Sequence, residues 1–165
     1  MSLSTHPKRW KSGLRYPRPL LRLPYAKGRY SMKRTKADLV RAWLVKAQKD
    51  LLFAQEALKK SEEYTDMACF HAQQSAEKPL EACLVWLEIE FPKTHVLEDL
   101  LDLIAQKDTS LEQWREGLRR MTPFAVETRY PEFSLPSWEE AEQAVKTTVE
   151  VLDTVKILLP SYCLP

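Results

Sequence analysis

The chain has 165 residues and a formal net charge of +2, with 44% hydrophobic residues and only three glycines. This length favours one domain with a sizeable core, and the scarcity of glycine argues against a turn-rich β fold. No uncharged apolar stretch approaches the roughly 20 residues that a membrane-spanning helix needs, so we expect no membrane segment.

The three cysteines (Cys69, Cys83 and Cys163) have neither the even number nor the short spacing of a disulfide framework or a zinc site. On one helix, Cys69 and Cys83 would lie roughly 20 Å apart, which is too far for a disulfide within the chain. We therefore expect free, buried thiols and a cytoplasmic protein.

The charge is distributed unevenly along the chain. Residues 1–34 contain ten Lys or Arg and no Asp or Glu, whereas the remainder contains 15 basic and 23 acidic residues. Four prolines in this arm make a continuous helix improbable. We expect a disordered basic arm over residues 1–34 and a folded domain over residues 35–160.

Three interpretations of the arm remain open. Aromatic residues that could stack on bases are interleaved with its basic residues, which fits RNA binding: Trp10, Tyr16, Tyr25 and Tyr30. The arm could instead bind an acidic partner. It could also be an inert tail, or lie outside the native protein if translation begins at Met32.

The remainder of the chain has helical periodicity. A first helix is predicted over residues 35–60, because apolar residues recur at steps of three and four: Leu39, Trp43, Ala47, Leu51, Ala54 and Leu58. A second helix is predicted over residues 66–88, with Thr65 or Asp66 as its N-cap. Pro92 follows it and breaks the pattern.

Three further helices are expected. Thr94 can cap the third, and the capping-box pattern Ser110-Leu-Glu-Gln opens a fourth. The fourth helix has the apolar positions Leu111, Trp114, Leu118, Met121 and Ala125. Residues 129–136 are expected to form a loop, and a capping box at Ser137 begins the last helix. The predicted fold class is all-α, an antiparallel up-and-down bundle of four to five helices.

The second helix has an unusual polar face. Steps of three and four place His71, Gln74, Lys78 and Glu81 in one line. Small residues beside them would let a neighbouring backbone come close: Ala68, Ala72, Ser75 and Ala76. These features indicate a groove or an interface, or else a half-exposed helix with solvated side chains. Pro79 predicts a kink, because it removes one helical hydrogen bond.

Four motifs occur in order along the chain: Trp43-Leu-x-Lys-Ala-x-x-Asp-Leu, Cys69-Phe-His-Ala-Gln-Gln-Ser-Ala-Glu-Lys, Thr94-His-x-Leu-x-x-Leu and Arg129-Tyr-Pro. Together they resemble the HEPN (higher eukaryotes and prokaryotes nucleotide-binding) domain family. The resemblance covers about residues 37–159. It implies a helical bundle that is usually a homodimer, and a partner that is a minimal nucleotidyltransferase in a two-component system of the toxin–antitoxin type.

The resemblance does not extend to catalysis. Many proteins of the family are metal-independent ribonucleases with an Arg followed, after four to six residues, by a His. None of the histidines (His6, His71 and His95) has an arginine at that spacing. We therefore expect no standard catalytic site, and the sequence indicates no metal site and no cofactor. Only convergence of His71 in space with Arg115, Arg119 or Arg129 could restore a nuclease site.

A binding site is the hypothesis that remains. Lys78 and Arg129 could pair with phosphate, Tyr130 could stack on a base, and His71 and Gln74 could supply directional hydrogen bonds. In the alternative, Tyr130 packs under a proline turn and Arg129 caps a helix end. The function expected is nucleotide or partner binding without catalysis. An RNA-binding or ribonuclease toxin and a helical interaction scaffold remain as alternatives.

Overall fold

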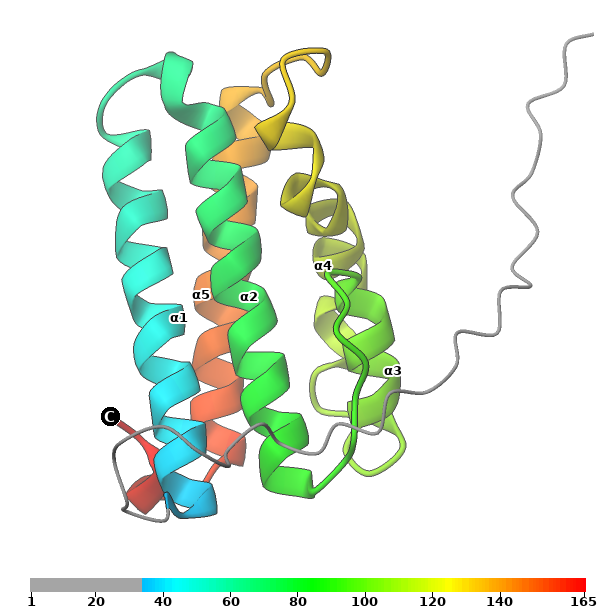
Figure 1. The fold of residues 1–165 in the computed structure, drawn as a ribbon. Helices are drawn as coiled ribbons and strands as arrows, with labels where there is room; N and C mark the ends of the chain where they lie inside the picture. The colour runs from blue at the N-terminus through cyan, green and yellow to red at the C-terminus, as the bar shows by residue number, and fades with distance from the viewer. Residues whose placement is uncertain (1–33) are drawn as a thin grey trace, which may run out of the picture. The chain divides into compact units, whose positions relative to one another are not determined.

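The computed structural model describes residues 34–165, which form a helical domain without a β-strand in that range (Figure 1). Its α-helices are α1 (Lys36–Leu58), α2 (Thr65–Leu87), α3 (Leu97–Ala105), α4 (Arg115–Met121) and α5 (Trp138–Leu158). The expectations for the basic arm, including disorder and RNA binding, fall almost entirely outside the described residues.

Short 3₁₀ helices complete the connections. They are η1 (Glu62–Tyr64), η2 (Glu112–Trp114), η3 (Thr122–Ala125), η4 (Glu127–Arg129) and η5 (Ser161–Cys163). The predicted loop at residues 129–136 therefore begins on the last residue of η4. A turn and an extended segment then lead to α5.

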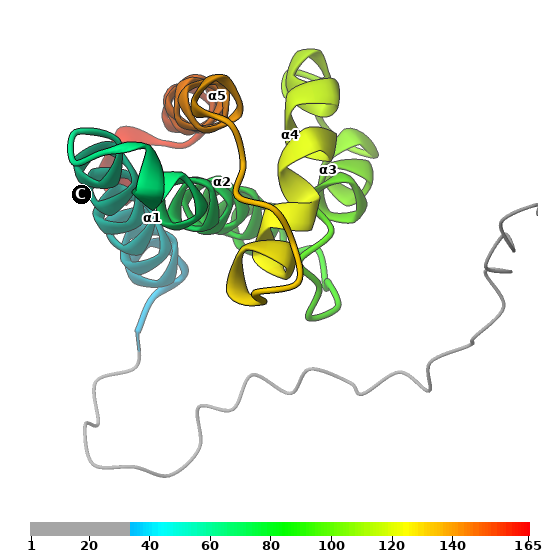
Figure 2. The same ribbon diagram turned by 90° about the horizontal axis from the view of Figure 1, so that it is seen from above.

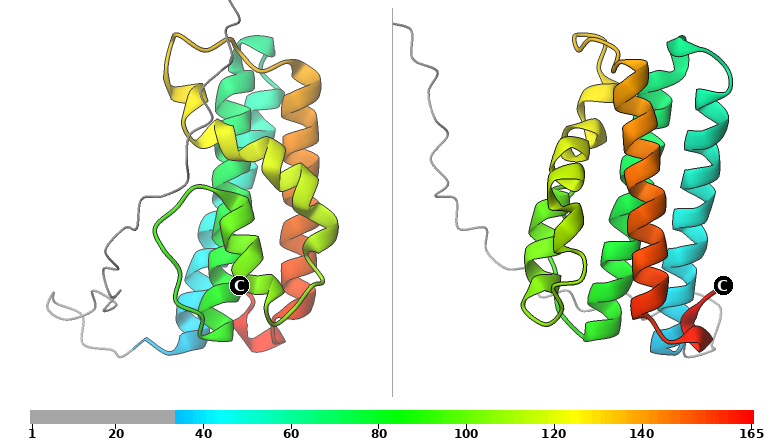
Figure 3. Two further views of the ribbon diagram at one scale, coloured as in Figure 1. Left: turned by 90° about the vertical axis from the view of Figure 1, so that its right-hand side faces the viewer. Right: turned by 180° about the vertical axis from the view of Figure 1, so that it is seen from behind.

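Apart from α3, the helices alternate in direction. In Figures 1 and 3, α1 rises, α2 descends, the short α4 rises obliquely and α5 descends, while α3 lies beside α2 and α4. The predicted all-α, up-and-down bundle is thus confirmed.

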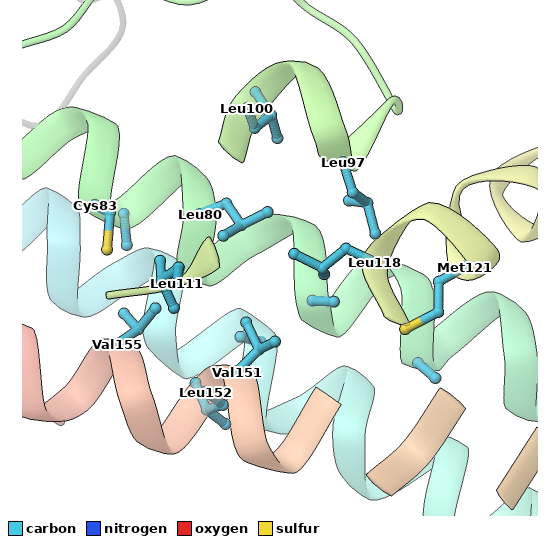
Figure 4. Close-up of a cluster of buried hydrophobic side chains, with 14 of the residues drawn as sticks. Leu80, Cys83, Leu97, Leu100, Leu111, Leu118, Met121, Val151, Leu152 and Val155 are labelled. Carbon is cyan, nitrogen blue, oxygen red and sulfur yellow. The ribbon is translucent and has the colours of Figure 1, made fainter. Parts of the chain in front are cut away.

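Helix α2 is the centre of the domain, since it contacts α1, α5, α3 and η3. Figure 4 shows the core around it, where Leu80 and Cys83 of α2 face side chains from α3, α4 and α5. Many of these side chains are inaccessible to solvent, as expected for close-packed helix interfaces: Leu97, Leu100, Leu111, Leu118, Val151 and Val155.

The buried side of α1 differs from the predicted one. Ala47 and Ala54 are buried as expected, but Leu39 and Trp43 are only half-buried, whereas Val40 and Leu44 are inaccessible to solvent. Helix α1 packs on both α2 and α5. Its buried face is therefore wider than the single stripe assumed from the sequence, and it is turned by one residue.

Small side chains on α2 allow close helix packing, as predicted. Ala68, Ala72, Ser75 and Ala76 are all buried. The Ser75 hydroxyl donates a hydrogen bond to the Ala47 carbonyl of α1 at 2.7 Å. On the opposite side, the Thr148 hydroxyl of α5 donates to the Ala72 carbonyl at 3.0 Å.

The helix starts follow the sequence at α5 but not at α2 and α3. Ser137 and Glu140 form the predicted capping box of α5. At α2, Tyr64 precedes the helix without a side-chain cap, because η1 runs directly into it and the Thr65 hydroxyl donates to the Glu62 carbonyl instead. At α3, the Leu97 amide donates to the Thr122 hydroxyl of η3, so a distant residue replaces Thr94 as the cap.

The predicted fourth helix is divided into η2, α4 and η3. The capping box at Ser110 does not form. The Ser110 amide donates to Asp108, and the Gln113 side chain donates to the Ser110 carbonyl. The predicted apolar positions still face the core, with Leu111, Leu118, Met121 and Ala125 buried and Trp114 half-buried.

Helix α2 continues through Pro79 as one element and ends at Leu87, and the next residue, Glu88, has a left-handed backbone (φ 57°). Proline therefore does not terminate the helix, although it withholds one backbone donor. At Glu88 the backbone amide donates to the last turn, which is the usual role of a left-handed helix terminus.

The three cysteines are free and buried, in agreement with the expectation. Burial raises the pKa of the Cys69 and Cys83 thiols to about 12. Both side chains therefore act as small apolar groups at neutral pH.

Within residues 34–165, none of the helices combines the length and the apolar character needed to cross a membrane.

Gly117 brings α4 close to α5. A Cβ atom at this position would lie 2.8 Å from Cγ2 of Thr147, a buried β-branched side chain that has little freedom to move. We expect Gly117→Ala to lower the free energy of unfolding by about 1–2 kcal/mol in urea denaturation, because overpacking outweighs the better helix propensity of alanine.

The double variant Gly117→Ala, Thr147→Ala is the control, since it removes the atom that clashes. It should recover most of the loss. A single Gly117→Ala variant that is more stable than the wild type would contradict the close contact between α4 and α5.

Candidate functional site

Asp50 of α1 holds the polar face of α2. Its Oδ1 atom lies 3.0 Å from Nδ1 of His71, and its Oδ2 atom lies 2.6 Å from Nζ of Lys78. The three side chains are between 15% and 23% exposed, so they form a largely desolvated cluster. Much of the polar face therefore packs against α1 instead of projecting into water.

The carboxylate also fixes the hydrogen on the His71 ring. A carboxylate only accepts hydrogen bonds, so the hydrogen is on Nδ1, and in the neutral ring Nε2 keeps its lone pair. This is the orientation that a histidine needs to accept a proton or a hydrogen bond from a ligand.

From Lys78 the hydrogen bonds continue across α2. Lys78 donates to the carbonyl and side chain of Gln74, which donates to the side chain of Gln73 at 2.8 Å. Gln73 donates to Glu77 at 2.9 Å, and Glu77 contacts Nδ1 of His95 at the same distance. We call these hydrogen-bonded side chains the polar chain: Asp50, His71, Lys78, Gln74, Gln73, Glu77 and His95. The polar chain links α1, α2 and the segment before α3.

The polar chain satisfies groups that would otherwise destabilise the fold. Gln73 is fully buried and Glu77 is 7% exposed. No buried polar side-chain atom of the described residues lacks a hydrogen-bond partner. An unpaired buried polar group lowers the stability of the folded state by about 1–3 kcal/mol. Much of the polar chain therefore has a structural role.

A second arrangement begins at His71. Its ring stacks on Phe53 of α1, with centroids 5.4 Å apart, and forms a T-shaped pair with Phe70, with centroids 5.3 Å apart. The guanidinium carbon of Arg129 lies 5.9 Å from the centre of the Phe70 ring. We call Phe53, His71, Phe70 and Arg129 the aromatic row.

The structure separates the five predicted site residues into four groups. Gln74 and Lys78 belong to the polar chain, and their donors are engaged within it. His71 belongs to both arrangements, and Arg129 ends the aromatic row. Tyr130 is half-exposed and follows Arg129 directly.

The sequence interpretation missed Asp50, Phe53 and Phe70 as members of the site. Asp50 stands in the motif Trp43-Leu-x-Lys-Ala-x-x-Asp-Leu, and Phe70 lies beside His71 in the second motif. Their presence in those motifs was the available signal. Phe53, which is 64% exposed, follows Asp50 by three residues and therefore lies on the same side of α1.

Of the three arginines considered for convergence with His71, Arg129 contacts the same ring as the histidine. Arg115 is held by Glu112 and Asp102, and Arg119 is held by Glu116. Within the described range, no carboxylate forms an ion pair with Arg129, whose cation–π contact leaves its N–H groups able to bind an anion.

Taken together, the aromatic row combines a stacking surface, an imidazole nitrogen with a lone pair and a cation. These groups suit a ligand with a flat ring and a phosphate. Residues 34–165 contain no group of three or more His, Cys, Asp or Glu placed to hold a metal ion.

Glu81 lies one turn beyond Glu77 on α2, and its burial creates a pH-dependent cost. Desolvation, followed by the charge of Glu77, raises the pKa of Glu81 to about 7 from an ordinary value of 4.5. The folded state therefore binds this proton more tightly than the unfolded state. Stability contributed by the protonated form is complete below pH 4.5 and is lost as the pH rises to about 7.

We expect Glu81→Gln to remove this loss. At pH 8 the variant should exceed the wild type in free energy of unfolding by about 1–3 kcal/mol, because the glutamine cannot ionise. At pH 4 the two proteins should differ little. Urea denaturation at several pH values measures the difference, with Glu90→Gln as an exposed control, and a constant difference at all pH values would contradict the assignment.

Comparison with known proteins agrees with this fold. The domain is similar to the crystal structure of TT1696 from Thermus thermophilus, with a TM-score of 0.60 and 25% identity over 73% of this chain and 98% of that one. It is also similar to ST0689, an archaeal HEPN homologue, with a TM-score of 0.56 and 26% identity over 77% of this chain and 98% of that one.

No curated protein matches the sequence significantly. The family model described as the HEPN domain matches residues 40–158, which is most of the chain and contains both the polar chain and the aromatic row. The chain therefore belongs to the HEPN domain family.

Proposed function

We propose that this protein binds a nucleotide at the aromatic row and acts as a binding protein and not as an enzyme. In this proposal the base stacks on Phe53 or Tyr130, His71 supplies a directional hydrogen bond, and Arg129 pairs with a phosphate oxygen. The observation that carries the proposal is the shared contact of His71 and Arg129 with Phe70, at 5.3 Å and 5.9 Å.

The polar chain supports this proposal by fixing His71. Asp50 determines which ring nitrogen carries the hydrogen, and Lys78 occupies the other carboxylate oxygen. A ligand therefore meets a preorganised imidazole, which lowers the entropy cost of binding. Lys78 and Gln74 contribute through this positioning, and direct phosphate contact falls to Arg129.

The partner of the protein is part of the proposal. Membership of the HEPN family supports a minimal nucleotidyltransferase as the partner, in a two-component system of the toxin–antitoxin type, and a homodimer as the oligomeric state. In this arrangement the nucleotide reaches the aromatic row either free or held by the transferase. Light scattering after size-exclusion chromatography tests for the dimer.

Nucleotide binding at the row depends on Arg129. We expect Arg129→Ala to weaken binding of a fluorescent ATP analogue roughly tenfold in a fluorescence anisotropy titration, since a charge-assisted hydrogen bond contributes about 1.5 kcal/mol or more. GTP and ATP competition then reports whether the base is distinguished.

Arg120→Ala provides a matched control, because Arg120 is an exposed arginine of α4 that pairs with Glu116. Its affinity should equal that of the wild type. Equal loss in both variants would indicate a general charge effect, and the absence of saturable binding in the wild type would remove the proposed ligand.

One observation favours a second candidate, an RNA-cleaving site. The dyad of His71 and Asp50 leaves Nε2 as a proton acceptor, and Arg129 lies 5.9 Å from the centre of the Phe70 ring that His71 also contacts. A histidine held in this way could take the proton of a ribose 2′-hydroxyl, whose oxygen then attacks the adjacent phosphorus and displaces the 5′-oxygen. The arginine would pair with the phosphate.

Labelled RNA incubated with the protein in EDTA tests this candidate. The RNA-cleavage hypothesis predicts cleavage that His71→Ala reduces roughly 100-fold or more. His95→Ala is the matched control, since His95 forms the comparable dyad with Glu77 outside the aromatic row. RNA that stays intact with the wild type would leave the binding function alone.

A further inference from the structure

One end of the bundle combines exposed apolar and acidic side chains. This end, nearest the viewer in Figure 2, is formed by residues 59–67 between α1 and α2 and by residues 124–142 before and at the start of α5. We call these two segments the acidic end. It carries six of the eleven large hydrophobic side chains that the described residues expose: Tyr64, Met67, Val126, Tyr130, Phe133 and Leu135.

The same segments are strongly negative. They contain three basic side chains and eight carboxylates: Glu62, Glu63, Asp66, Glu127, Glu132, Glu139, Glu140 and Glu142. In the described part of the chain none of these eight forms a side-chain ion pair, whereas Lys59 pairs with Glu56. The position of Glu140 is explained by the capping box of α5. Glu127 begins only the three-residue helix η4, and Glu132 lies outside the helices, so neither carboxylate is explained as a helix cap.

A small pocket lies within the acidic end. Its volume is about 110 Å³, and its lining combines an apolar part with two carboxylates: Phe124, Leu135 and Pro136 with Glu127 and Glu140. Nucleotide and cofactor sites are roughly 300 Å³ or larger. This pocket therefore suits a single long side chain with an apolar stem and a positive end, which describes lysine and arginine.

The charge of the surface decides between classes of partner. Nucleic acid and anionic membranes carry dense negative charge, so the acidic end repels them. An apolar partner alone would leave the carboxylates to be desolvated without compensation. A polypeptide segment with alternating basic and apolar side chains satisfies both features of the surface.

We propose that the acidic end is a docking surface for a basic, apolar segment of a partner protein, with one lysine or arginine side chain in the pocket between Phe124 and Leu135. The positive charge of this lysine or arginine lies at Glu127 and Glu140. The apolar side chains next to it in the partner segment cover Val126 and Phe133. Arg129 and Tyr130 stand in the same segment but do not line the pocket, and the proposal does not depend on nucleotide binding.

A labelled peptide of alternating lysine and leucine tests the proposal on the full chain by fluorescence anisotropy. We expect saturable binding that weakens as NaCl rises from about 0.05 to 0.5 M, because exposed charges are screened. Leu135→Ser and Glu127→Gln should each weaken binding about three- to tenfold. Both side chains are exposed, so these variants should fold normally, which circular dichroism verifies.

Two variants at other places provide matched controls. Leu52→Ser changes a leucine of comparable exposure on α1 (60%, against 57% for Leu135), and Glu90→Gln removes one exposed carboxylate beyond α2. Both should keep the affinity within twofold of the wild type. A peptide of alternating glutamate and leucine should not bind.

Equal weakening in the controls, equal binding of the glutamate peptide or no saturable binding would overturn the proposal. Leu135→Ser separates these outcomes from the nucleotide titration with Arg129→Ala, because Leu135 lines the pocket and Arg129 does not, whereas Glu127 shares η4 with Arg129. Failure of the docking surface is therefore distinguishable from failure of the proposed nucleotide site.

Discussion

The central position of α2 is the constraint on which the rest of the structure depends. Helices on several sides bury much of it, so each buried polar side chain that it carries must find a partner within the protein. Asp50 of α1 binds His71 on one side of α2, and His95 binds Glu77 on the other. The same hydrogen bonds that stabilise the helix also fix the orientation of His71.

This double use supports the proposal that a structural network prepares a binding site. His71 is held through Nδ1, which leaves Nε2 and the ring face for contacts with Phe53 and Phe70. The aromatic row is therefore hydrogen-bonded where it meets the core and more exposed toward Arg129 and Tyr130. Affinity gained by such preorganisation needs few contacts.

The two proposed surfaces differ in charge and in the size of the ligand that each would bind. The aromatic row offers a cation and ring faces, which suit a phosphate-bearing ligand, whereas the acidic end offers carboxylates around apolar side chains. Arg129 of the aromatic row and Glu127 of the acidic end lie on the same short helix η4, so the two proposed sites are neighbours on this segment. That arrangement is consistent with a protein that acts through a partner.

The sequence determined the helices, the buried cysteines and the family, because apolar periodicity and short motifs are local properties of the chain. Only the tertiary structure decided what the polar face of α2 contacts. Asp50 is 21 residues from His71, and Thr122 caps a helix that begins 25 residues earlier. Spacing along one helix reports which residues share a face, whereas the partner of that face depends on how separate helices pack.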